Sequence, residues 1–248
     1  MSFRRCAIPH RTEEAARDLA RAREDARADL MRARHRLSKL LLRHGILYEQ
    51  GRAWTRAHDG WLGQIRLERL AARAAFDDTY GAVLSAGIRR DSLDHQIAQM
   101  ATDPRWAGVV GRLGCPRGVG TLTAFALCVE IGDWHRLTGA TIGAYLGLVP
   151  NESQSGTRHA RGPITKAGNS HARRLLVEAR AQVRTSAAIQ RRRAGQPPQV
   201  RARAEQAGLR LHHRWYQLER RRGLRSTIVA TAVARELAGW CWSLAMMD

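Results

Sequence analysis

Apolar residues recur every three or four positions through most of this chain, a pattern that predicts a mainly α-helical protein. Between Thr12 and Gly45 they form a narrow stripe, with charged residues at most other positions, as in a coiled-coil seam. The stripe consists of Leu19, Ala22, Ala26, Leu30, Ala33, Leu37 and Leu40. Threonine caps helix N-termini and glycine ends helices. We therefore expect one long helix between these two residues.

A second helical pattern covers residues 62–100 and is weakened locally by Gly81 and Gly87. Two long helices joined by a short connector lie antiparallel, so residues 11–102 are predicted to form a coiled-coil arm. The Leu19–Leu40 seam is also where we expect the chain to form at least a dimer. Four aspartates of the second helix are interpreted as solvated residues of a charged outer face, not as catalytic pairs: Asp77, Asp78, Asp91 and Asp94.

From Asp103 onward the predicted helices become short and are separated by glycines. Residues 110–127, VGRLGCPRGVGTLTAFAL, have the pattern of a helix-hairpin-helix motif. Gly118 and Gly120 would let the hairpin backbone approach a phosphate, and the helix beginning at Thr121 would present free N–H groups to it. The alternative is a tight helical turn that needs glycine only for its shape.

The predicted fold class is therefore mainly α, a long antiparallel coiled-coil hairpin followed by a compact helical domain at residues 103–190. Residues 191–225 contain two arginine triplets and Gln196-Pro197-Pro198, which predict a basic, partly flexible segment that neutralises phosphate. Residues 226–248 predict a closing amphipathic helix whose tryptophans are core or interface residues.

The net charge of the chain predicts the kind of partner that it binds. The chain has 42 Lys+Arg against 22 Asp+Glu, a net charge of +20, and its only lysines are Lys39 and Lys166. Guanidinium groups bind phosphate in bidentate fashion, so the excess predicts a nucleic-acid partner. A GC-rich genome would explain the preference for arginine but not the excess of positive charge.

No apolar run is long enough to span a membrane, and no signal-type apolar segment follows Met1. The cysteines show no metal-ligand spacing, and no metal site is predicted. They are Cys6, Cys115, Cys128 and Cys241. We expect a cytoplasmic, nucleoid-associated protein without a membrane partner.

Candidate chemistry is concentrated in residues 153–176, SQSGTRHARGPITKAGNSHARRLL. A serine that attacks a phosphodiester needs cations near the phosphorus centre and a permissive backbone. Ser153 and Ser155 precede Gly156, and a series of basic residues follows. The alternative is a solvated loop ahead of a basic helix, and composition alone does not separate the two.

The segments GVGTLTAFALCVEIGDW, IGAYLGLVP, the serine run and ITKAGNSHARRLL closely resemble the C-terminal half of one family. This is the insertion-sequence one-ten and one-sixteen family of bacterial transposases. The similarity covers nearly the whole chain and is weakest around residues 190–210. It implies a DNA recombinase guided by a structured bridge RNA. Its active site would combine Mg²⁺-binding acids of an N-terminal DEDD nuclease-like domain with a serine from another subunit.

Under this resemblance Ser155 is the candidate nucleophile and Ser153 the second choice. The expected DNA and RNA contacts are Gly118, Gly120, Thr121, Arg158, Arg161, Lys166, Asn169, His171, Arg173 and Arg174. Residues 1–10 resemble the exit from the nuclease domain, so we expect a truncated copy. It would have no cofactor of its own and would need Mg²⁺ only with the missing domain. The alternatives are a non-catalytic DNA/RNA-binding protein derived from a transposase, and a helical scaffold with merely solvating arginines.

Overall fold

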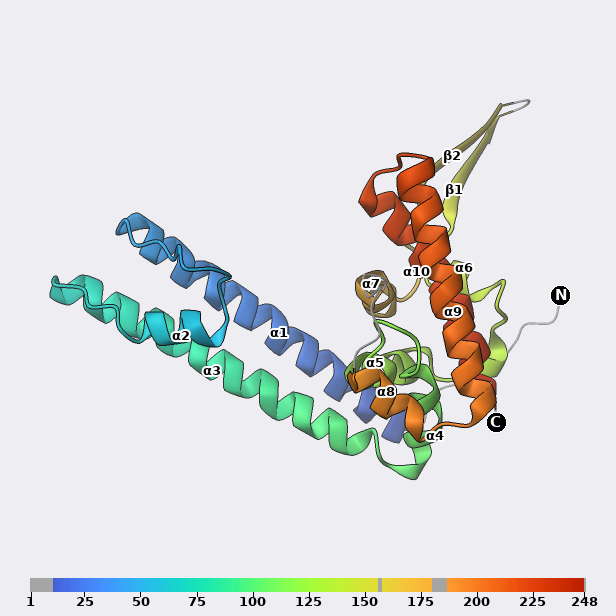
Figure 1. Cartoon of the computed structure of the whole chain (residues 1–248), viewed down its shortest axis with the longest axis horizontal. Coiled ribbons are helices and arrows are strands. Elements are labelled where there is room, and N and C mark those ends of the chain that lie inside the picture. The colour runs from blue at the N-terminus through green and yellow to red at the C-terminus, as the bar shows by residue number, and fades with distance from the viewer. Residues whose placement is uncertain (1–10, 156–157, 180–186, 248) are drawn as a thin grey trace. The chain divides into compact units, whose positions relative to one another are not determined.

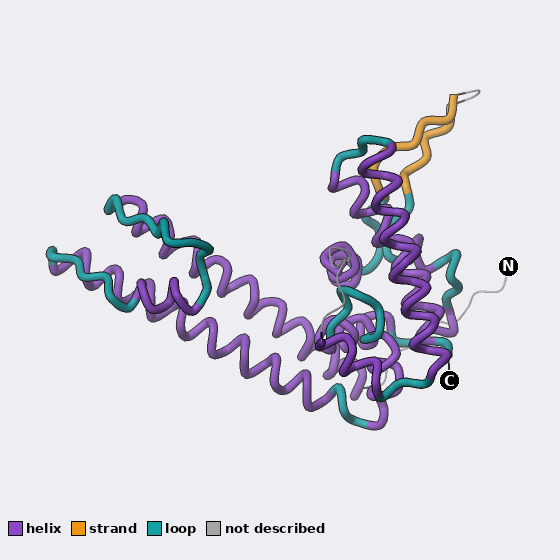
Figure 2. Tube along the Cα trace, in the orientation of Figure 1, coloured by secondary structure: helices purple, strands orange, loops and turns teal. Residues whose placement is uncertain are grey.

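The computed structural model describes residues 11–155, 158–179 and 187–247, with residues 152–155 and 158–161 described by their backbone alone. It divides into two compact units, Arg21–Gln96 and the remainder, Met1–Ala20 with Ile97–Asp248. Helices dominate both units, which confirms the mainly α prediction (Figures 1 and 2). Within the described ranges no helix combines the length and apolar character needed to cross a bilayer.

The unit Arg21–Gln96 is the predicted two-helix arm. It contains most of α1 (Arg11–Arg43), the short α2 (Arg56–Leu62) and most of α3 (Leu70–Met100). Arg23 Nε donates to Asp94 Oδ1 at 2.6 Å, and Arg89 Nη1 donates to Asp29 Oδ2 at 3.0 Å. The higher-numbered residue of α1 in these two pairs contacts the lower-numbered residue of α3, so the two helices run antiparallel (Figure 1). Asp94 is thus an inter-helix ion-pair partner, which corrects its interpretation as a solvated residue.

The coiled-coil seam is filled from within the chain. Leu30 and Leu37 of α1 are 2% and 0% exposed and belong to one cluster with Phe76 and Val83 of α3. Leu62 of α2 completes this cluster and is also fully buried. A second copy would have to displace α3 to reach this part of the seam. The structure therefore offers no free seam there for the predicted dimerisation, and the oligomeric state stays a prediction.

The larger unit is built around α5 (Thr121–Ile131), which is buried from Ala124 to its last residue. Three helices contact it or one another: α4 (Pro104–Leu113), α7 (Ser170–Ala179) and α10 (Ser226–Ala245). Asp103 caps α4 by accepting the Arg105 backbone N–H at 2.8 Å, and Pro104 occupies the first turn, where a missing N–H costs nothing. Short elements η1 (Trp134–Arg136) and α6 (Ile142–Tyr145) follow α5.

The structure corrects the prediction of a partly flexible segment at residues 191–225. This region forms α8 (Ala187–Ala194), α9 (Pro198–Tyr216) and η2 (Gln217–Arg221). Pro198 stands in the first turn of α9, where proline is compatible with a helix. Val200, Ala204 and Ala207 give α9 a buried face, so apolar packing orders a region whose composition is strongly basic.

The closing helix α10 confirms the prediction for the C-terminal region. Its apolar face is buried, and Leu237 is completely inaccessible. Trp242 Nε1 donates to the Leu137 carbonyl at 3.0 Å, which fixes the indole against the turn that follows η1.

Burial should make the described thiols unreactive in the native protein. Cys115, Cys128 and Cys241 are free and buried, and burial raises the pKa of both Cys128 and Cys241 to about 12. Because the thiolate is the reactive form, a Cys6→Ser variant at pH 8 should react with a disulfide reagent such as DTNB only on unfolding. Absorbance before and after addition of guanidinium measures this. Rapid native labelling of these thiols would contradict the buried arrangement.

Candidate functional site

The serine run forms a two-stranded hairpin instead of the loop expected from sequence. Strand β1 (Pro150–Ser155) pairs antiparallel with β2 (Arg158–Ile164), with Ser155 opposite Arg158 and Pro150 opposite Ile164. The hairpin projects beyond the helices of its unit (Figure 1). At about 3.3 Å per residue, Ser155 lies roughly 16 Å along the strand from Pro150. The candidate nucleophile therefore occupies the outer end of the hairpin, although its side chain lies outside the described part.

Two glycine loops interlock at the base of this hairpin. Gly168 has φ +76°, and a Cβ there would lie 2.0 Å from the Tyr145 carbonyl oxygen. Gly147 has φ +65°, and a Cβ there would lie 2.1 Å from the Ala167 oxygen. Only glycine permits both the left-handed conformation and this backbone contact. The Lys166 N–H donates to the Gly147 carbonyl at 3.1 Å and completes the junction.

Arg173 clamps the same two loops together. Its Nη1 donates to the Leu146 carbonyl at 2.9 Å and to the Ala167 carbonyl at 3.1 Å. Arg174 is paired with Glu178 one helical turn later, at 2.7 Å. Arg173 and Arg174, both predicted to contact nucleic acid, thus form hydrogen bonds or ion pairs within the protein itself. Lys166, predicted for the same role, is exposed.

A buried carboxylate lies beneath this base. The Glu130 side chain on α5 is 0% exposed and accepts from Asn169 Nδ2 at 2.5 Å. Its other oxygen lies 3.0 Å from His171 Nδ1, on a ring that is 14% exposed. Asn169 Oδ1 meanwhile accepts the Ala172 N–H at 2.9 Å and caps α7, which fixes the amide orientation. With Glu130 ionised, His171 Nδ1 carries the proton, and Nε2 accepts in the neutral ring.

Sequence reasoning missed Glu130, although one signal pointed to it. It is the single charged residue in the apolar run TLTAFALCVEI of α5. A carboxylate is buried in such a run only when hydrogen-bond donors meet it. Asn169 and His171, predicted as DNA or RNA contacts, are those donors.

In the hairpin between α4 and α5, Gly118 and Gly120 have different surroundings. Gly118 has φ +87°, and a Cβ there would lie 1.7 Å from the oxygen of Ala179, the last residue of α7. This packing favours the alternative of a turn that needs glycine for its shape. Gly120 caps α5 in open space and is followed by Thr121, so the N-terminus of that helix keeps the geometry expected of an anion site.

Two arginines of α8 stabilise the α4–α5 hairpin by donating hydrogen bonds to its backbone carbonyls. Arg192 Nε donates to the Gly114 carbonyl at 3.0 Å, and Arg193 Nε donates to the Cys115 carbonyl at 2.9 Å. Arg193 is 7% exposed and pairs with Glu205, whose pKa is held below its ordinary value chiefly by that hydrogen bond. Two members of the triplet predicted to neutralise phosphate are therefore structural.

Besides Gly118, Gly120 and Thr121 at the α4–α5 hairpin, the predicted site residues fall into two groups. Ser153, Ser155, Arg158 and Arg161 belong to the hairpin strands, and Lys166 through Arg174 lie at its base. Within residues 11–155, 158–179 and 187–247 no three His, Cys, Asp or Glu side chains gather as metal ligands.

Residues 115–195 match the family model described as Transposase IS116/IS110/IS902 family. This segment is therefore similar to the IS116/IS110/IS902 family of transposases. The matched segment contains the α4–α5 hairpin from Cys115 onward, Glu130, both strands and α7. This match agrees with the resemblance drawn from the sequence for residues 115–195, and the interlocked loops and the buried carboxylate lie inside the matched segment.

Curated relatives extend the similarity along the chain. A putative transposase, y4qE of Sinorhizobium fredii, is 35% identical over 245 residues, covering 96% of this chain and 59% of the relative. The transposase for insertion sequence element IS1533 of Leptospira borgpetersenii is 33% identical over 222 residues, covering 87% and 64% respectively. A probable family 20 transposase of Pseudomonas aeruginosa is 37% identical over 107 residues, 42% of this chain and 30% of the relative. The chain spans less than two thirds of the length of these relatives.

Proposed function

We propose that this protein takes part in DNA transposition and that Ser155 is its nucleophile. The observation that carries the proposal is the position of Ser155 at the outer end of a hairpin within the family segment. A nucleophile that attacks the DNA backbone must extend beyond the surface of its domain, and a projecting hairpin allows this. The interlocked glycine loops and the Arg173 clamp anchor the base of the hairpin.

The proposed step is a transesterification that conserves the phosphate ester. The Ser155 hydroxyl oxygen attacks the phosphorus atom of a DNA phosphodiester and forms a bond to it. The bond from phosphorus to the 3′ oxygen breaks, and that oxygen leaves as a 3′ hydroxyl after taking up a proton. The serine proton passes to solvent or to a base. The product is a 5′-phosphoserine link that water does not consume, so the strand can be rejoined elsewhere.

Cations are required where negative charge accumulates during the attack. Arg158 pairs with Ser155 in the strand register, and Arg161 follows on the same strand. We propose these two arginines as the phosphate contacts at the nucleophile, with Ser153 as the second choice of nucleophile.

A covalent adduct tests the proposal, and we expect it to depend on Ser155. The chain is mixed with DNA, guide RNA and a separately expressed DEDD nuclease-like domain with Mg²⁺. Denaturing gels then separate DNA linked to protein from free DNA. Ser155→Ala should abolish the adduct, whereas Ser153→Ala, a matched loss of one hydroxyl on the same strand, should leave it. No adduct with the unmodified chain, or equal yields from unmodified and Ser155→Ala protein, would overturn the catalytic role.

The net charge of +20 supports a second candidate, a nucleic-acid-binding protein that performs no chemistry. Phosphate contacts release counterions, so its affinity should fall linearly in log K against log salt. Salt-sensitive binding without adduct in the same assay would favour this candidate. A dimer and a guide RNA, both implied by the resemblance, remain part of the proposal.

A further inference from the structure

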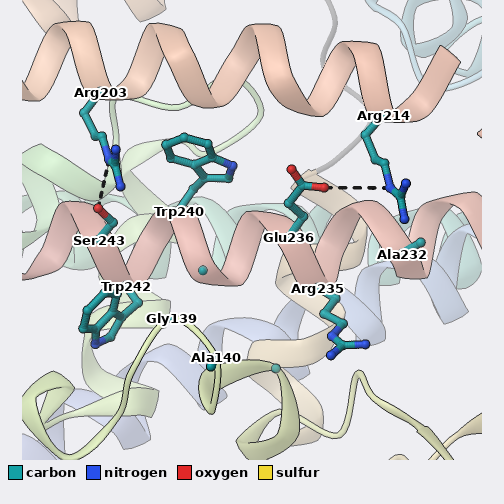
Figure 3. Close-up of a pocket in the computed structure, with 12 residues that line it drawn as sticks. Gly139, Ala140, Arg203, Arg214, Ala232, Arg235, Glu236, Trp240, Trp242 and Ser243 are labelled. Carbon is teal, nitrogen blue, oxygen red and sulfur yellow. Dashed lines mark hydrogen bonds and ion pairs between the residues drawn. The ribbon is translucent and has the colours of Figure 1, made fainter. Parts of the chain in front are cut away.

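A hollow of about 560 Å³ crosses the outer face of α10, between α9 and the turn at residues 139–143 (Figure 3). It lies within the larger unit, and none of its lining residues belongs to the serine hairpin. On α10 the lining includes Ala232, with a single methyl group, and Gly239, with no side chain, which leaves room above the helix. The volume falls within the range of about 300–1,000 Å³ that ligand sites occupy.

The hollow is strongly basic. Arg203 and Arg214 reach it from α9, and Arg235 reaches it from α10 (Figure 3). Among its described lining residues the one carboxylate is Glu236, which lies 3.9 Å from Arg214 Nε inside the hollow and pairs more closely with Arg210 outside it, at 2.7 Å (Figure 3). Arg235 makes no hydrogen bond or ion pair with any described residue. An anionic ligand would therefore meet a guanidinium that requires no release from another partner.

Two indoles accompany these cations and are held in place. The Arg203 guanidinium lies 4.6 Å from the centre of the Trp240 ring, and its Nε donates to Ser243 Oγ at 2.9 Å. Trp242 is fixed by its hydrogen bond to the Leu137 carbonyl. Both rings are only partly buried, so apolar flat surfaces and cations share one preformed site.

Glycine in the turn sets the position of Arg235. A Cβ at Gly143 would lie 3.1 Å from Arg235 Cγ and 3.4 Å from its Nε. The absence of a side chain at Gly143 thus allows the arginine stem to lie against the turn.

We propose that this hollow binds an unpaired nucleotide, with its phosphate at Arg235 and Arg214 and its base against Trp240. Guanidinium groups bind phosphate bidentately, and indoles stack on any base. A base-paired nucleotide has both faces stacked and cannot offer one to the indole, so the site selects single strands. A free nucleotide and a single-stranded polynucleotide share this chemistry. The proposal is independent of the serine chemistry, because binding is measured without strand cleavage.

Fluorescence anisotropy of the full chain with labelled single-stranded oligothymidylate tests the site. Arg235→Gln should weaken binding about 10-fold, which is about 1.4 kcal/mol. Arg191→Gln removes the same charge from an exposed position outside the hollow and should weaken binding much less. Equal losses from the two variants would overturn the proposal, since they would reflect net charge alone.

Two further measurements separate the nucleotide from a general phosphate surface. Trp240→Leu should weaken binding 5-fold or more, about the loss of one stacked base, while Trp240→Phe should retain most of it. Unchanged binding by Trp240→Leu would overturn the role of stacking. A duplex of the same length should be insensitive to Arg235→Gln, and an equal loss there would also overturn the proposal. Competition by thymidine monophosphate identifies a free nucleotide as ligand, and binding that needs the polymer identifies a strand.

Discussion

Replacing Glu130 by alanine is expected to lower the free energy of unfolding by about 3 kcal/mol. The carboxylate is completely buried, and its removal leaves Asn169 Nδ2 and His171 Nδ1 without their acceptor. An unpaired buried donor costs its full desolvation penalty, and the lost side chain leaves a cavity as well. The cap on α7 loses its orienting partner at the same time, so the effect should extend to the base of the hairpin.

Urea unfolding followed by circular dichroism measures this loss. Glu178→Ala is the matched control, because it removes a carboxylate whose side chain is 54% exposed and which pairs with Arg174 one turn away. Exposed pairs contribute about 0–1 kcal/mol, so the control should remain close to the unmodified protein. Comparable losses from both variants would contradict a structural role for the buried carboxylate.

The second large effect is expected at Gly118. An alanine there must adopt φ +87° and place its Cβ 1.7 Å from the Ala179 oxygen, so the hairpin or α7 has to move. We expect Gly118→Ala to lower the free energy of unfolding by about 3 kcal/mol or to prevent folding. Thermal or urea unfolding measures the loss.

Gly223 provides the control for backbone strain alone. Its φ is +61°, but a Cβ there has nothing within 4 Å, so Gly223→Ala should cost about 1 kcal/mol. The comparison also separates the two interpretations of the hairpin. A Gly118→Ala protein with unchanged stability and lost DNA affinity would restore phosphate approach as the reason for glycine.

Periodicity was sufficient to predict the long helices. The stripe of α1 and the apolar face of α10 repeat at helical spacing because each is buried along one side. The strands carry no comparable signal, since PNESQS and RHARGPI show no alternation of apolar and polar residues. Their pairing depends on backbone hydrogen bonds and on a base assembled by distant loops, which a local pattern does not reveal.

The candidate site was only partly predictable for a similar reason. Composition marks every arginine as a potential phosphate contact, but it does not show which guanidiniums meet carbonyl groups in three dimensions. Arg173, Arg192 and Arg193 donate to the backbone, whereas Arg235 in the hollow has no described partner. The seam of α1 likewise has the same sequence pattern whether its partner is a second copy or α3.

The arginines that hold the α4–α5 hairpin also constrain when it can be completed. The Cys115 carbonyl cannot accept its hydrogen bond from Arg193 until that residue, 78 positions later, has been synthesised. Arg117 likewise cannot donate to Glu205 until the chain has grown 88 residues beyond Arg117. A ribosome adding about 5–20 residues per second needs several seconds to deliver them. During synthesis the nascent hairpin therefore lacks these hydrogen bonds until α8 and α9 have emerged. A stalled or shortened translation product would lack them permanently.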